Sequence, residues 1–314
     1  MGTDPSATAL VLTYRRPRLA TEVVRNLMDS EGLPADRIVL VVNGQGGLDD
    51  PELESRIGLL RLSENLGPAG GFARGLGYVR EHSDTPWIYV CEDDSGRLNL
   101  PSPRLGAVID RAERFERDVP GLPVGAVVAT GWDIDERTGR TWRHPIGPSA
   151  SGFEEVAYGP WWATLLSRRV LDAGVFPDEP LYWWAEDLDF FLRVRSAGFR
   201  VLMDAAADRY RRTAIREENP VSRPRREDEP WCSYYMARNP FRLGRHHGGV
   251  RWTIWHLLKS VRRFQLAPTK AHRAATVRGL MDGLRGRTGR NPAFVRDVGE
   301  LVSSDAGAPR RASG

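Results

Sequence analysis

Short apolar runs alternate with helix-like stretches through the first half of the chain, and this alternation constrains the fold more than any other feature. Residues 8–13, 37–42, 57–62 and 87–91 are apolar runs of strand length. The stretches that begin at Pro17 and Pro68 have helical spacing, and proline is favoured in the first turn of a helix. Strands separated by helices form parallel βαβ units with right-handed crossovers. The sequence therefore predicts an α/β fold with a mostly parallel sheet flanked by helices.

The sequence after residue 91 predicts further strands and helices, followed by a helical tail. Helices are expected over residues 104–117 and 186–197, and strands over 124–130, 161–167 and 199–204, whereas 131–151 reads as irregular. Residues 219–230 are charged and contain prolines, as linkers do. We therefore predict an α/β domain over 1–218, a basic helical extension over 219–302 and a disordered tail over 303–314.

Composition narrows the classes of protein that fit. Hydrophobic residues make up 41% and charged residues 27% of the 314 residues, which is ordinary for a globular protein. No apolar run is long enough to predict a membrane-spanning helix. Cys91 and Cys232 are too few for a disulfide framework or a cysteine metal cluster, which favours a reducing, cytoplasmic location.

Charge is distributed unevenly along the chain. Residues 231–290 contain 13 Lys and Arg but a single acid, Asp282, whereas the whole chain has a net charge of only +4. An acidic body joined to a basic tail indicates two surfaces with different partners.

The triplet Glu92-Asp93-Asp94 follows directly after the fourth predicted strand. Adjacent carboxylates repel one another unless positive charge compensates them. Ligands of open parallel sheets bind beyond the carboxyl ends of the strands, and carboxylate oxygens suit Mg²⁺ or Mn²⁺. The triplet thus predicts a divalent-metal site, with a solvated acidic turn as the alternative.

Polar or glycine-rich segments also follow the first three predicted strands. They are Thr13-Tyr14-Arg15, Asn43-Gly44, and the stretch from Asn65 through Gly67 and Gly71 to Arg74. Glycine lets the backbone approach a ligand closely, and an arginine near a helix start can pair with phosphate oxygens. The alternative is a tight strand-to-helix connection in which the glycines serve packing alone.

A second acidic group, Glu186-Asp187, begins the helix predicted at 186–197. Acids are favoured at helix starts by the helix dipole, so they need no further function there. Four tryptophans near the two acids offer flat apolar walls on which sugar rings could pack, or they form ordinary aromatic core. They are Trp161, Trp162, Trp183 and Trp184.

Taken in order, these segments resemble the inverting family 2 glycosyltransferases of the GT-A fold, a Rossmann-like α/β fold. The similarity is greatest to the bacterial rhamnosyl- and galactofuranosyltransferase branches, and it covers roughly residues 7–215. Tyr234-Tyr235 with Arg238-Asn239 also resembles the start of the helical tail in this branch. The matching segments are Thr13-Tyr14-Arg15-Arg16, Asn43-Gly44, Asn65-Leu66-Gly67, Gly70-Gly71-Phe72-Ala73-Arg74-Gly75, Glu92-Asp93-Asp94, Gly159-Pro160-Trp161-Trp162, Gly174-Val175-Phe176 and Glu186-Asp187-Leu188-Asp189.

The resemblance implies transfer of a sugar from a UDP- or dTDP-sugar to an acceptor hydroxyl, with Mg²⁺ or Mn²⁺ as cofactor. The acceptor would be a glycan, a polyprenol-linked glycan or a natural product. Asp94 and Glu92 would bind the metal, and Asp187, with Glu186 as its rival, would be the base. Donor contacts would come from Thr13, Arg15, Asn43, Asn65, Gly67, Gly71, Arg74 and Asp93, and acceptor contacts from the four tryptophans.

Three positions depart from the family pattern. Glu92 replaces the first aspartate of the metal motif, and Asn43 stands where aspartate is frequent. Many relatives also have a metal-binding histidine some two dozen residues after the base. Here that region has Tyr210, and the next histidine is His246, which leaves Asp208 or a water as the alternative ligand.

The basic tail contains an amphipathic helical pattern. Five apolar residues share one face beside Trp252 and Trp255: Ile254, Leu257, Leu258, Val261 and Phe264. The flanking cations are Arg251, Lys259, Arg262 and Arg263. This pattern is typical of a helix on an anionic membrane surface, here the inner face of the plasma membrane, although packing on the α/β domain or in a homodimer would also explain it.

Two other functions are weaker alternatives. Nucleotidyltransferases commonly place a lysine on the phosphates, and this chain has no lysine before Lys259. A non-catalytic binder of nucleic acid or membranes would use the basic tail but would leave the acidic groups unexplained. We therefore do not expect nucleic acid as a partner.

Overall fold

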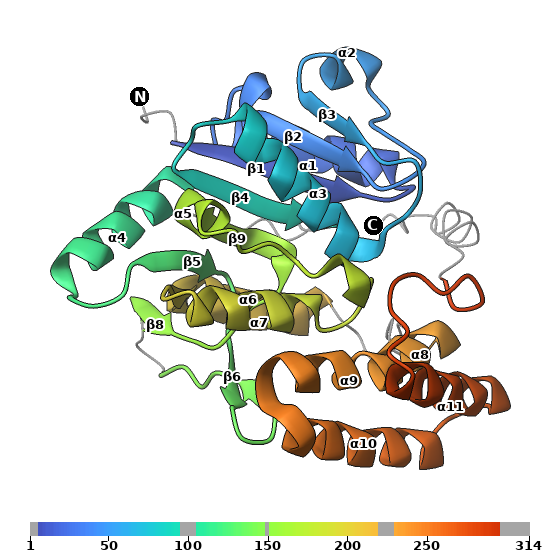
Figure 1. Cartoon of the computed structure of the whole chain (residues 1–314). Helices are drawn as coiled ribbons and strands as arrows, with labels where there is room; N and C mark the ends of the chain where they lie inside the picture. The colour runs from blue at the N-terminus through green and yellow to red at the C-terminus, as the bar shows by residue number, and fades with distance from the viewer. Residues whose placement is uncertain (1–5, 95–104, 148–150, 219–228, 296–314) are drawn as a thin grey trace, which may run out of the picture.

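The computed structural model describes residues 6–94, 105–147, 151–218 and 229–295. The predicted disordered tail, 303–314, lies outside these residues, as do positions 219–228 of the predicted linker. An eight-stranded sheet forms the centre, in the order β3-β2-β1-β4-β9-β5-β10-β8 (Figure 1). Its strands are β1 (Ala7–Thr13), β2 (Ile38–Val42), β3 (Gly58–Arg61), β4 (Trp87–Glu92), β5 (Val124–Val128), β8 (Phe153–Glu155), β9 (Thr164–Ser167) and β10 (Arg200–Asp204).

The strand pairing confirms the predicted mostly parallel sheet. β1 pairs in parallel with β2 and β4, β2 with β3, and β5 with β10. β9 runs antiparallel between β4 and β5, and β8 is antiparallel at the edge beside β10. Because β1, β2 and β4 are parallel neighbours, the segments that follow them emerge at the same edge of the sheet.

Helices cover both faces of the sheet, because alternate strand residues carry apolar side chains to opposite sides. Leu10 and Leu12 of β1 lie in the core beneath α3, α5 and α6, whereas Ala9 and Val11 face α1 and α4. The helices of this α/β body are α1 (Pro17–Asp29), α2 (Pro51–Glu54), α3 (Gly67–His82), α4 (Leu105–Asp118), α5 (Arg168–Asp172), α6 (Glu186–Ser196) and α7 (Ala205–Glu218).

Three expectations for the α/β body need correction. The stretch read as irregular contains a hairpin, β6 (Trp132–Asp135) with β7 (Arg140–Arg143). The strand expected over 161–167 is a strand only from Thr164, because Trp161–Ala163 forms a 3-10 helix after Pro160. Helix α7 was not predicted at all; Asp204 begins it by accepting hydrogen bonds from the backbone of Ala206 and Ala207.

The basic extension is helical, as predicted, and packs below the sheet in Figure 1. It comprises α8 (Pro230–Arg238), α9 (Pro240–Leu243), a π-helical turn (Gly244–Gly248), α10 (Gly249–Gln265) and α11 (Lys270–Leu284). Helices α8 and α11 approach closely because Gly279 and Gly283 have no side chain. A Cβ at Gly279 would lie 2.2 Å from the carbonyl oxygen of Tyr234.

Asp282, the single acid among residues 231–290, is buried between α8 and α11. It accepts hydrogen bonds from Tyr234 Oη at 2.9 Å and from Arg278 and Arg287 at 3.1 and 3.2 Å. This acid therefore pairs with cations inside the extension, whereas Arg242 and Arg290 pair with Asp178 and Glu64 of the α/β body. Among the described residues, no helix combines the length and apolar character needed to cross a lipid bilayer.

Candidate active site

A pocket opens where β1, β2 and β4 end, at the sheet edge predicted from the sequence. Its walls come from the ends of these three strands, the start of α3, the segment before α6 and the start of α8. The lining residues are Leu12, Thr13, Tyr14, Arg16, Asn43, Asn65, Gly67, Pro68, Glu92, Tyr182, Trp183 and Trp231. A larger hollow lies at the opposite edge of the sheet, around Thr8 and His82, away from both acidic groups.

The acidic triplet after β4 is compensated by Arg16. Asp93 is buried, accepts a hydrogen bond from Thr13 Oγ1 at 2.7 Å and forms an ion pair with Arg16. The same guanidinium bonds to Asp94 Oδ2 at 3.0 Å. Burial raises the pKa of Asp93 to about 6, although the charge of Arg16 opposes this shift. Glu92 and Asp94 are only half-buried, and Glu92 lines the pocket.

A second arginine, Arg211 of α7, acts on the triplet from another element. Its side chain is buried, stacks on the Trp162 ring, and has no hydrogen-bond acceptor for Nε among the described residues. Burial and the charge of Arg143 lower its pKa to about 9, while Asp94 raises it. Arg211 lies two dozen residues after Asp187, where the family resemblance implies a histidine. Neither this arginine nor Arg16 was predicted from the sequence to be a site residue.

Two asparagines shape the wall of the pocket between β2 and α3. Asn43 Nδ2 donates to the carbonyl oxygen of Gly67 at 2.9 Å, and Asn43 Oδ1 accepts from the Leu66 amide at 2.8 Å. Asn65 Oδ1 accepts from the Gly67 amide at 2.8 Å. Gly67 itself has φ +69°, and a Cβ there would lie 2.1 Å from the carbonyl oxygen of Tyr182. The glycine thus lets α3 start in contact with the segment before α6.

Four of the predicted donor-binding residues lie outside the pocket lining. One is Asp93, which is buried against Thr13 and Arg16. Gly71 is buried against Leu12 and Asn43, so it serves the packing of α3 on β1. Arg15 bonds to Gln45 Oε1 at 3.1 Å. Arg74 is exposed and forms an ion pair with Glu179 at 3.0 Å.

The acidic pair at the start of α6 is held in a poorly solvated environment. Burial and the charge of Asp187 raise the pKa of Glu186 well above its usual range, and Glu92 adds to this effect. Burial raises the pKa of Asp187 to about 6, although its side chain keeps some exposure. Glu92 and two residues shortly before the acidic pair, Tyr182 and Trp183, line the same pocket, and the charge of Glu92 acts on Glu186. Glu186 and Asp187 are not among the lining residues.

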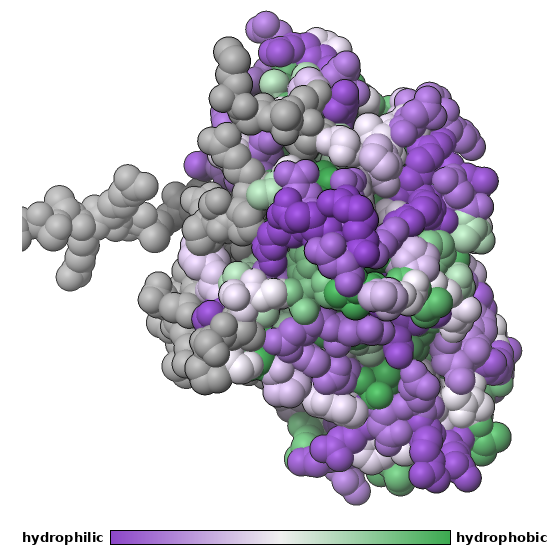
Figure 2. Space-filling view, turned by 90° about the vertical axis from the view of Figure 1, so that its left-hand side faces the viewer, coloured by the Kyte–Doolittle hydropathy of each residue, from purple (hydrophilic) through white to green (hydrophobic). Residues whose placement is uncertain are grey.

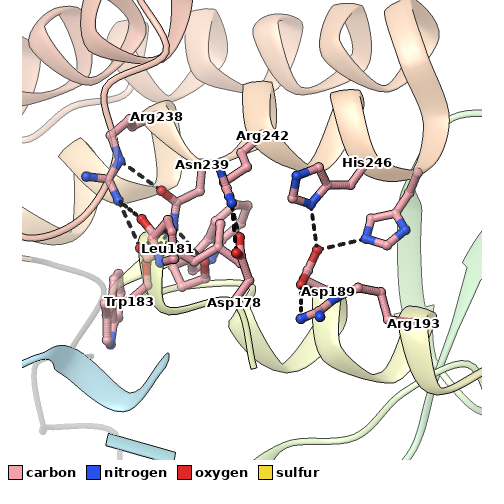
Figure 3. A network of polar contacts seen from close by, with 12 residues as sticks. Asp178, Leu181, Trp183, Asp189, Arg193, Arg238, Asn239, Arg242 and His246 are labelled. Carbon is pink, nitrogen blue, oxygen red and sulfur yellow. Dashed lines mark hydrogen bonds and ion pairs between the residues drawn. The ribbon is translucent and has the colours of Figure 1, made fainter. Parts of the chain in front are cut away.

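The backbone just before the acidic pair is strained. Tyr182, Trp184 and Ala185 have φ angles of +65°, +74° and +64°, which are unfavourable for residues with a Cβ. Asn239 of the extension holds this segment: its Nδ2 donates to the carbonyl oxygens of residues 181, 183 and 184 at 3.1, 2.7 and 2.9 Å (Figure 3). Arg238 donates to residue 181 at 2.9 Å and to Asn239 Oδ1 at 2.9 Å.

A second contact joins the extension to α6 (Figure 3). The buried carboxylate of Asp189 lies 2.8 Å from His247 Nε2 and 3.3 Å from His246 Nδ1, and it pairs with Arg193 at 2.7 Å. The three side chains Asp189, His246 and His247 are close enough to hold a metal ion. The arginine, however, already supplies charge to this carboxylate, and imidazole N–H donors complete its hydrogen bonding. We therefore interpret the cluster as a hydrogen-bonded latch between α6 and the extension.

The four tryptophans predicted to contact an acceptor occupy different environments. Trp161 is 3% exposed and lies among Phe72, Phe190 and Phe191, so its ring has no surface to offer a sugar. Trp162 stacks with Arg211. Trp184 packs edge-on against His256 of α10. Trp183 lines the pocket, where its ring packs against Trp231 at a centroid distance of 4.5 Å.

No protein-family model matches this chain, and no curated protein matches it. Among solved structures it is similar to GalNAc-T7 with UDP, GalNAc and Mn²⁺, with 11% identity and a TM-score of 0.46. That match covers 64% of this chain and 42% of the other, so this chain spans about two fifths of GalNAc-T7. It is also similar to the mannosyltransferase PcManGT from Pyrobaculum calidifontis in complex with GDP-Man and Mn²⁺. Identity there is 16%, the TM-score is 0.41, and the match covers 90% of this chain and 87% of the other.

Proposed function

We propose that this chain is an inverting glycosyltransferase of the GT-A type that uses a nucleotide diphosphate sugar as donor. The observation that carries the proposal is a pocket at the carboxyl ends of the strands, lined by Glu92 and by Trp183. Trp183 shortly precedes the poorly solvated pair Glu186 and Asp187. A carboxylate with a raised pKa is suited to accept a proton near neutral pH. Strand ends of an open parallel sheet are the usual place for a nucleotide.

The pocket supplies contacts for the parts of a nucleotide sugar. Asn43, Asn65 and Thr13 offer hydrogen-bonding groups, and Trp183 with Trp231 offers an aromatic wall. Arg16 and Arg211 supply positive charge beside Asp94. We assign these two arginines to the diphosphate, because guanidinium groups pair well with phosphate oxygens and Arg211 has an unused buried N–H.

The side chains after β4 fit a divalent cation. Glu92 and Asp94 are half-buried carboxylates two positions apart, and oxygen donors of this kind suit Mg²⁺ or Mn²⁺. Asp208, the alternative ligand, is buried and already paired with Arg143 and Arg212, so it is a poor candidate. A bound cation would supply positive charge against the leaving diphosphate. Arg16 would keep its ion pair with Asp93, and the nitrogen that now bonds Asp94 could turn to the phosphates.

Asp187 is the proposed base. The acceptor oxygen attacks the anomeric carbon from the face opposite the diphosphate, the bond to the diphosphate breaks, and the acceptor proton passes to Asp187. The nucleoside diphosphate leaves with the bonding electrons, and the anomeric configuration inverts. Burial and the charge of Asp187 raise the pKa of Glu186 well above its usual range, which favours its protonated form. It thereby limits repulsion within the pair.

Release of nucleoside diphosphate from a panel of UDP-, dTDP- and GDP-sugars tests this function. We expect release with one nucleotide class, stimulated by Mn²⁺, and thermal stabilisation by the same nucleotide. Asp94→Asn should abolish the Mn²⁺-dependent part of that stabilisation, whereas Asp110→Asn, an exposed aspartate of α4, should not. Pyrophosphate formation from a nucleoside triphosphate and a sugar phosphate would instead identify a nucleotidyltransferase.

The raised pKa of Asp187 predicts a pH profile. The base must be ionised, so kcat/KM should be level above about pH 7, half-maximal near the pKa of about 6, and fall about tenfold per pH unit well below it. Initial rates between pH 4.5 and 8 measure this limb, each at a pH where thermal melts show a folded protein. A fall that begins only below about pH 4.5 would be contrary to a desolvated base.

A further inference from the structure

Helix α10 exposes an apolar row on the outer side of the extension. The other helices of the extension lie on one side of α10, and its opposite side bounds the molecule in Figure 1. In Figure 2, hydrophobic side chains are visible along the lower end of the molecule, at the level of the extension. The outward residues recur with helical spacing and are between 39% and 74% exposed: Val250, Ile254, Leu257, Leu258, Val261 and Phe264.

The opposite side of α10 is buried even though it carries polar groups. Trp252 is buried and donates through Nε1 to the carbonyl oxygen of Glu136, in the turn between β6 and β7, at 2.7 Å. His256 and Ser260, one and two turns further on, are also buried. In a surface helix of a globular protein the apolar stripe usually faces the core. In α10 the apolar stripe faces outward instead.

The charge around this row is positive. Residues 249–285 contain eight Lys and Arg and one acid, the buried Asp282. Arg251, Lys259 and Arg262 are exposed beside the apolar row on α10 itself. A second copy of the same face would bring like charges together, which disfavours a symmetric dimer through α10. Nucleic acid would satisfy the cations but would leave the apolar row without a partner.

We propose that the outward face of α10 binds an anionic lipid bilayer. Its apolar side chains would enter the boundary between headgroups and acyl chains, and the flanking cations would pair with lipid phosphates. This inference goes beyond the proposed glycosyl transfer and does not depend on it. Binding through α10 would orient the molecule with its helical extension toward the bilayer.

Sedimentation with vesicles tests this proposal on the full chain. We expect binding to vesicles of phosphatidylcholine mixed with phosphatidylglycerol and much weaker binding to phosphatidylcholine alone. The double variant Ile254→Ser/Leu258→Ser should reduce the partition coefficient at least about tenfold. The matched control is Leu122→Ser, because Leu122 is 52% exposed, as is Ile254, but lies between α4 and β5. The control should bind as the unaltered protein does.

Further results would support or overturn lipid binding by α10. Weaker binding by Lys259→Glu/Arg262→Glu, and in high salt, supports the charged component. Equal vesicle binding by the Ile254→Ser/Leu258→Ser variant and the control would overturn the proposal. A second result would also overturn it: the unaltered protein does not bind vesicles, and light scattering shows a dimer. If the double variant is then a monomer, α10 contacts a second copy of the chain. Loss of glycosyl transfer plays no part in this readout.

Discussion

Asp187→Asn is expected to reduce glycosyl transfer by a factor of about 10² to 10⁴ while donor affinity changes little. The amide cannot accept the acceptor proton, yet it has nearly the same shape as the carboxylate. The proposed donor contacts come from other elements, chiefly the ends of β1, β2 and β4, which line the pocket. Transfer is measured as nucleoside diphosphate release at saturating acceptor, and donor affinity by calorimetry.

The stability of this variant separates a chemical effect from misfolding. The pKa of Asp187 is raised from 3.8 to about 6 in the folded chain, so the folded state favours the protonated form. The contribution of Asp187 to the free energy of unfolding therefore falls as pH rises from about 4 to about 6, and it stays lower above that. Removing the charge should leave the variant at least as stable as the unaltered protein at pH 8. An equal loss of transfer and donor binding would contradict the role of Asp187, and a large loss confined to Glu186→Gln would move that role to Glu186.

Asn239→Ala is expected to lower the free energy of unfolding by about 3 kcal/mol and to lower kcat as well. The change removes the side-chain donor of the Trp183 and Trp184 carbonyl oxygens and one of the two side-chain donors of Leu181. Positive φ angles at three residues of this segment persist only while the surroundings hold them. Once released, the segment would relax and move the acidic pair. Chemical denaturation and steady-state kinetics measure the two effects.

Two further variants make this prediction specific. Asn291→Ala, at a partly exposed asparagine of the extension, should change stability and kcat far less. Ala185→Gly in the Asn239→Ala background should recover part of the loss, because glycine adopts the φ of +64° without steric cost. A loss of stability with an unchanged kcat would show that Asn239 supports the fold without positioning the acids.

Local sequence patterns predicted the parts of the fold that depend on local chemistry. Buried strands such as β1 and β4 read clearly from their apolar runs, and the acids after β4 were identified as site candidates. Helix α7 was missed because its sequence is largely charged after the first turn and carries little apolar periodicity. The β6–β7 hairpin was missed because its strands are short and half-exposed.

Two arginines of the proposed site were not predicted from the sequence, for a different reason. Arg16 and Arg211 gain their importance from Asp93 and Asp94, which are distant in sequence, so no local pattern marks them. The positive φ angles of the segment before α6 carry no glycine signal, since Asn239 imposes them through tertiary hydrogen bonds. Trp161 could not be separated from the other tryptophans, because burial rather than residue type sets its environment.

The hydrogen bonds from Asn239 to the segment before α6 have a consequence for biosynthesis. All strands of the central sheet precede residue 205, so a ribosome-bound chain can assemble the sheet well before the extension emerges. The carbonyl groups of residues 183 and 184, just ahead of Glu186, lack the side-chain donor of the folded protein until Asn239 has been translated. The growing polypeptide would thus complete its sheet before the proposed catalytic acids reach their final positions. Incomplete chains would therefore be inactive.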